Sequence, residues 1–228
     1  MPDYYINANV HTRDAQSVRR AVRDIFMAQG FAPLAETPAC DVVEDDDALP
    51  SDADWYGVMV SGASGRGWVS VYVDDWQDSG LLSRALSEAL GVEVLEIWVA
   101  EDVHWGYTLF ENGAVTDRCA DDPRSVADTP EEAALYAGRA DAFAALLAQP
   151  ADALQAALDT AHAQSGEFAG PGVDALADAV GLPFEHVFTG YEFFFSDDPE
   201  DYGPSLDHWA EFRHLAFRNP PGRDTLAD

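Results

Sequence analysis

The chain has 228 residues, of which 42 are Asp or Glu and 12 are Lys or Arg, so its formal net charge at pH 7 is −30. All the basic residues are arginine. The lack of lysine excludes P-loop nucleotide binding, protein-kinase chemistry and Schiff-base or pyridoxal catalysis, which all depend on a lysine side chain. Direct binding to DNA or RNA is also disfavoured, because affinity for phosphate backbones comes largely from basic side chains.

The charge excess has two interpretations. Repulsion among carboxylates opposes folding and is screened when salt shortens the Debye length, so the acidity fits adaptation to molar salt. Alternatively, the acidic surface binds a basic partner or imitates DNA. Residues 1–10 contain no apolar run or basic leader, and no segment has the length of a membrane span. We therefore expect a soluble, cytoplasmic protein without membrane association.

The first 125 residues alternate between strand and helix patterns. Strands are predicted at 4–10, 55–60, 67–73, 92–99, 104–110 and 114–118, and helices at 15–29 and at 81–90, where Gly91 ends the second helix. The stretch 36–54 is acidic, contains two prolines and lacks periodicity, which predicts a long exposed loop. Asn112 and Gly113 suit the two positive-φ positions of a type I′ turn, so the last two strands are predicted to form a hairpin.

This order of elements predicts an α+β fold with a mainly antiparallel sheet and helices on one face, related to a split βαβ arrangement. After Pro130 the chain is rich in alanine and leucine. Helices are predicted there at 131–147, 151–163 and 172–180, with a short strand at 191–195. We expect a sheet domain over 1–125 and a mainly helical part over 126–228 packed on it, as separate units or one composite domain. The pattern of 205–217 fits either helix or strand.

The first candidate site is the acidic segment before the predicted hairpin, which contains Glu101, Asp102 and His104. Alternation along an extended segment would place Asp102 and His104 on one face. A carboxylate and an imidazole suit zinc, manganese or iron, although a site needs a third ligand. The alternative is an exposed acidic turn with a solvated histidine.

The second candidate site lies near the C-terminal end. If the segment is a helix, Asp207, Glu211 and His214 share one face, which could bind a divalent cation or act in acid–base catalysis. If it is a strand, Glu211 and His214 point to opposite faces and the cluster does not form.

The glycine-rich segment 61–67 could hold an anion with its backbone N–H groups, but it precedes a strand, and a hairpin loop is the simpler interpretation. Cys40 and Cys119 lie far apart in sequence and outside any zinc-ligand spacing.

Several short motifs resemble those of a broad group of uncharacterised bacterial proteins of unknown function. They lie at 67–71, 86–95, 104–110, 181–183 and 190–191, with Gly113, Asp117 and Pro123 between them. The resemblance implies no activity and supplies no catalytic residues.

No segment matches a hydrolase triad, an ordered metal motif or a nucleotide-binding loop. We therefore interpret the chain as a non-catalytic binding or interaction protein, regulatory or immunity-type, whose partner is a basic protein or a second copy. The alternative is a metal-dependent hydrolase that uses Asp102 and His104, or Asp207, Glu211 and His214. No cofactor is predicted apart from the divalent metal of that alternative.

Overall fold

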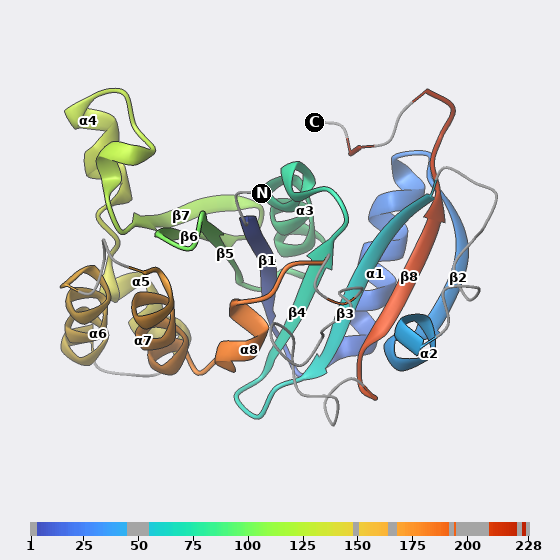
Figure 1. Ribbon diagram of the computed structural model, residues 1–228, viewed down its shortest axis with the longest axis horizontal. Coiled ribbons are helices and arrows are strands. Elements are labelled where there is room, and N and C mark those ends of the chain that lie inside the picture. Colours follow the sequence, from blue (N-terminus) through green and yellow to red (C-terminus); the bar gives the residue numbers. More distant parts are fainter. Residues whose placement is uncertain are drawn as a thin grey trace.

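The computed structural model describes residues 4–44, 55–147, 151–163, 168–191, 194, 210–222 and 225–226. Within these residues the chain forms an eight-stranded sheet with the order β2-β8-β3-β4-β1-β5-β6-β7 (Figure 1). Neighbouring strands are antiparallel. The α+β class and the antiparallel sheet are therefore confirmed. No helix in this described part of the chain combines the length and apolar character needed to cross a bilayer.

The strands are β1 (Tyr4–His11), β2 (Ala32–Pro38), β3 (Trp55–Ala63), β4 (Trp68–Val73), β5 (Val94–Ala100), β6 (His104–Glu111), β7 (Ala114–Ala120) and β8 (Arg213–Arg218). The helices are α1 (Ala15–Ala28), α2 (Ala39–Glu44), α3 (Ser79–Leu90), α4 (Pro130–Ala133), α5 (Ala140–Leu147), α6 (Ala151–Ala163), α7 (Gly170–Val180) and α8 (Phe184–Val187). Short 3₁₀ helices in the described part of the chain include η2 (Trp76–Asp78), η3 (Pro123–Ser125) and η4 (Ala134–Tyr136). The inner strands β3-β4-β1-β5, with α1 and α3 in the two crossovers, have split βαβ topology.

Helices α1 and α3 lie on the same face of the sheet (Figure 1). Val18, Val22 and Phe26 recur at helical spacing along α1 and are fully buried. The ring of Phe26 stacks on Phe217 of β8 with 4.6 Å between centroids. Full burial of one such side chain contributes about 1.5–3 kcal/mol, so this stripe fixes α1 on the sheet. Helix α3 ends at Gly91, whose φ of 63° gives the left-handed C-cap predicted there.

On the opposite face, the C-terminal helices α5, α6, α7 and α8 pack against the part of the sheet that contains β1, β5, β6 and β7 (Figure 1). Side chains of β5 alternate between the two faces of the sheet. Leu95 and Ile97 pack in the core formed with these helices, while Val94 packs in the core formed with α1 and α3. Glu96 also faces α3, where it accepts a hydrogen bond from Ser83 at 3.1 Å. Burial on both faces explains why β5 reads as a dense apolar run.

The predicted loop at 36–54 is wrong over its described part. Strand β2 continues to Pro38, and α2 occupies the following residues to Glu44, while 45–54 lie outside the described residues. An edge strand tolerates proline because one side of its backbone has no ladder partner. Most of β2 is exposed, so it lacks the apolar alternation by which a strand is usually recognised.

Residues 205–217 fitted either helix or strand, and over their described part the structure has a strand, because β8 pairs with both β2 and β3. Two other predictions for the C-terminal part need correction. Tyr191 and Phe194, the described residues of the predicted strand 191–195, are not in a strand. The predicted helix 131–147 is interrupted at Gly138, whose φ of 71° brings the chain against β7. A Cβ there would lie 3.0 Å from the Cys119 Sγ, so the close approach requires glycine.

Candidate functional site

A pocket of about 460 Å³ opens where β5 ends and β6 begins. Its lining residues are Tyr5, Ile6, Trp98, Ala100, Glu101, His104, Ser125 and Val126. Strand register brings them together, because Ile6 is the partner of Trp98 across β1 and β5, and Ala100 is the partner of His104 across β5 and β6. Directly paired residues share a face, so a row of side chains from three strands forms one side of the pocket.

The indole of Trp98 lies over the backbone of β6. Its strand partner is Gly106, and a Cβ at this position would overlap the Trp98 ring. Glycine is therefore required here for close approach, not for an unusual φ. The consequence is a large aromatic side chain held against the sheet at the pocket.

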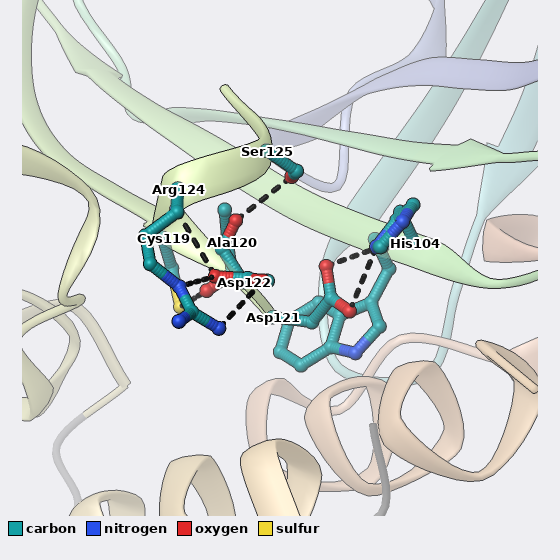
Figure 2. A network of polar contacts seen from close by, with 8 residues as sticks. His104, Cys119, Ala120, Asp121, Asp122, Arg124 and Ser125 are labelled. Carbon is teal, nitrogen blue, oxygen red and sulfur yellow. Dashed lines mark hydrogen bonds and ion pairs between the residues drawn. The ribbon is translucent and has the colours of Figure 1, made fainter. Parts of the chain in front are cut away.

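His104 is oriented by a buried carboxylate. Its Nδ1 lies 3.2 Å from the Asp121 Oδ2, and the backbone N–H of Trp105 donates to Asp121 Oδ1 at 3.1 Å (Figure 2). The Asp121 side chain is 1% exposed and that of His104 is 39% exposed. The carboxylate favours a proton on Nδ1, so in the neutral ring Nε2 is the acceptor. Asp121 thus fixes both the ring orientation and its hydrogen-bonding character.

The turn between β5 and β6 is strained. Glu101 and Asp102 have φ values of 55° and 56°, in the left-handed region that residues with side chains rarely adopt. The backbone N–H of Ala169, which precedes α7, donates to the Asp102 carbonyl at 2.7 Å and helps to hold this conformation. Asp102 Oδ1 is buried and has no hydrogen-bond partner among the described residues. The turn presents the carboxylate of Glu101 to the pocket, and Asp102 follows it in the turn.

The predicted pairing of Asp102 with His104 on one face is not what the structure shows. The extended conformation ends at Ala100 and resumes at His104, so strand alternation does not apply between the two candidates. His104 pairs instead with Asp121, which the sequence interpretation missed. Register was the available signal, because a hairpin centred on Asn112 and Gly113 brings residue 121 opposite the start of β6.

The predicted C-terminal cluster does not form on a helix. Asp207 lies outside the described residues, Glu211 lies in a turn, and His214 lies within β8. His214 Nε2 is 2.7 Å from the Tyr191 hydroxyl, and burial lowers the pKa of His214 to about 4. The imidazole is therefore neutral at pH 7 and buried, and its position is that of a core residue.

The glycine-rich segment connects β3 and β4, as the simpler interpretation predicted. Residues 62–65 border a smaller pocket of about 190 Å³, together with Pro183, Glu185, His186, Glu211 and Phe212. The two carboxylates of that pocket would repel an anion held by the loop. The structure thus gives no support for an anion cradle at this loop.

Cys119 is a poor nucleophile. Its Sγ lies 3.5 Å from His162 Nε2, while His162 Nδ1 lies 2.7 Å from the Leu158 carbonyl oxygen. Burial, together with the nearby carboxylates of Asp117 and Asp121, raises the pKa of the Cys119 thiol to about 12. The thiolate that nucleophilic catalysis requires is therefore disfavoured.

The described residues contain no group of three His, Cys, Asp or Glu side chains arranged to hold a metal ion. The pocket that contains Glu101, Trp98 and the His104–Asp121 pair is consequently the arrangement from which a function can be argued. We name it the β5–β6 pocket. No protein-family model, curated protein or solved structure matches the chain, so the resemblance noted in the sequence stays a prediction.

Proposed function

We propose that this chain is a non-catalytic interaction protein that binds a basic protein partner through the β5–β6 pocket. One observation carries the proposal: several groups that line the pocket favour positive charge. Glu101 is a carboxylate, the Nε2 of neutral His104 accepts hydrogen bonds, and the face of the Trp98 ring attracts cations. Among the residues that the structure describes, no Lys or Arg lines the pocket. A positively charged group of a partner fits this lining better than an anion.

The overall charge supports the same partner class. A chain with a net charge of −30 attracts basic proteins over a distance set by the Debye length, which raises the association rate. Such long-range attraction gives little selectivity by itself. A pocket with a tryptophan anchor supplies the local contact, since tryptophan is enriched among the residues that dominate binding energy.

The test is affinity capture with the immobilised full chain at about 150 mM salt, where exposed charges are partly screened. The variants are Trp98→Ala, Glu101→Gln and a control, Glu111→Gln, which removes one exposed carboxylate from the far end of β6. We expect a basic protein that is retained by the wild type and the control and lost with both pocket variants. Equal retention by all four chains would contradict a role for the pocket.

A hydrolase is the second candidate, because Asp121 orients His104 as a general base requires and Ser125 lines the same pocket. However, the Ser125 hydroxyl donates to the Asp122 carbonyl at 2.8 Å and not, among the described residues, to His104. The metal-dependent form of this candidate predicts a saturable rise in melting temperature with one divalent metal, lost in His104→Ala. A melting temperature that responds to no metal would refute it.

A further inference from the structure

The lining of the β5–β6 pocket also indicates which chemical group of the partner it accepts, an assignment that rests on the proposed function. We infer that the group is the guanidinium of an arginine side chain carried by the partner. Ammonium and guanidinium both satisfy the charge of the pocket. The arrangement of the aromatic, acceptor and apolar residues of the pocket favours guanidinium over ammonium.

The aromatic component favours a planar cation. Trp98 is held on the sheet by its contact with Gly106, so its position is fixed before a ligand arrives. A guanidinium is flat and weakly hydrated, and it stacks on an aromatic ring at a lower desolvation cost than a compact ammonium. A preformed indole surface is thus better matched to arginine than to lysine.

The acceptor component favours a group with several fixed donors. Glu101, His104 Nε2 and the Ser125 hydroxyl oxygen are contributed by three separate segments around the pocket. A guanidinium carries five N–H donors in a rigid fork, whereas an ammonium carries three on one atom. A quaternary ammonium has none and would leave the acceptors without partners.

The remaining lining suits the arginine stem. Ile6, Ala100 and Val126 give the pocket apolar walls, against which three methylene groups can pack while the charged end reaches the acceptors. The volume of about 460 Å³ lies within the range of ligand pockets and leaves room for a whole side chain. The described lining of the smaller pocket beside Glu185 and Glu211 has carboxylates but no tryptophan, so it does not favour guanidinium in the same way.

The experiment uses the full chain labelled with ¹⁵N and follows the indole N–H signals, with that of Trp98 assigned from a Trp98→Phe variant. The probes are N-acetyl-arginine amide, N-acetyl-lysine amide, N-acetyl-citrulline amide and free L-arginine. Citrulline has nearly the shape of arginine but no charge. We expect a saturable shift of the Trp98 signal with capped arginine, at least about fivefold weaker binding of capped lysine, and no saturation with citrulline.

Binding of free arginine distinguishes a pocket for a small metabolite from a pocket for the side chain of a protein partner. Its α-ammonium and α-carboxylate cancel in net charge but are both strongly hydrated, so we expect free arginine to bind no more tightly than the capped form. Glu101→Gln should weaken capped-arginine binding by about tenfold, while Glu111→Gln should leave it unchanged. Unchanged melting temperatures and unchanged signals from the other indoles would show that both variants are folded. Tighter binding of free arginine would overturn the assignment to a protein side chain.

The outcomes also separate this inference from the proposed function. If lysine or citrulline binds as well as arginine, or if no probe shifts the Trp98 signal, the guanidinium assignment is wrong. The proposed function would still stand if capture of a basic protein depends on Glu101 and Trp98. If that capture is independent of both residues, the interaction role of the pocket fails, whatever the probes do.

Discussion

Protonation of His214 should destabilise the fold on the acid side of neutrality. The imidazole is buried within β8, bonded to the Tyr191 hydroxyl and in edge contact with the Trp55 ring. Gly57 on the neighbouring strand leaves the space for this arrangement, since a Cβ there would overlap the Tyr191 hydroxyl. A charged imidazole in this position would lose its hydration, and burial accordingly lowers the His214 pKa to about 4.

The size of the effect follows from the two pKa values. The pKa falls from its ordinary value of 6.5 to about 4 in the folded chain, so between these values the unfolded chain binds the proton more tightly. The contribution is complete above pH 6.5 and is lost as the pH falls through about 4. The difference corresponds to about 3 kcal/mol of unfolding free energy between pH 7 and pH 4.

Urea denaturation at several pH values between 7 and 4, at fixed salt, measures this loss. His214→Gln is the comparison, because glutamine is a polar, hydrogen-bonding side chain that does not titrate. Wild type should lose about 3 kcal/mol more than the variant over this range, while carboxylate titrations common to both chains cancel. Parallel pH profiles for the two chains would refute the assignment of a buried, neutral His214.

Three further predictions follow from charge and burial. The melting temperature should rise steeply between low-salt buffer and molar KCl, because salt screens a net charge of −30; an equal melting temperature at both would show that repulsion among the carboxylates does not limit the stability of the fold. Burial raises the pKa of Glu96, so the folded chain favours the protonated carboxylic acid, and the stability that this form contributes is lost as the pH rises. Glu96→Gln should therefore raise the free energy of unfolding at pH 7. Denaturant titrations below pH 4.5 should show no such gain. Ellman's reagent should react with Cys40 in the native chain and with Cys119 only after unfolding, since burial raises the pKa of Cys119 to about 12. Rapid reaction of a second thiol in the folded protein would contradict this prediction.

The sequence predicted those elements whose pattern is local. Helix α3 was recognisable from its apolar stripe and Gly91, and the β6–β7 hairpin from Asn112-Gly113, because each signal lies within a few residues of the element that it ends or connects. Strands β2 and β8 were not recognised as part of the sheet. They pair with each other across more than 170 positions in the chain, and the exposed β2 carries no alternation that could reveal its partner.

The candidate site was harder to predict for a related reason. With 42 carboxylates in the chain, an acidic residue near a histidine is uninformative, and proximity in sequence led to Asp102 and not to Asp121. The register of the hairpin places Asp121 beside His104. The positive φ values of Glu101 and Asp102 turn Glu101 toward the pocket, and the residue types at these two positions do not predict such φ values. The Trp98 position depends likewise on a glycine across the ladder. Each feature of the β5–β6 pocket arises from backbone geometry acting between segments, so it becomes visible only when the strands are aligned.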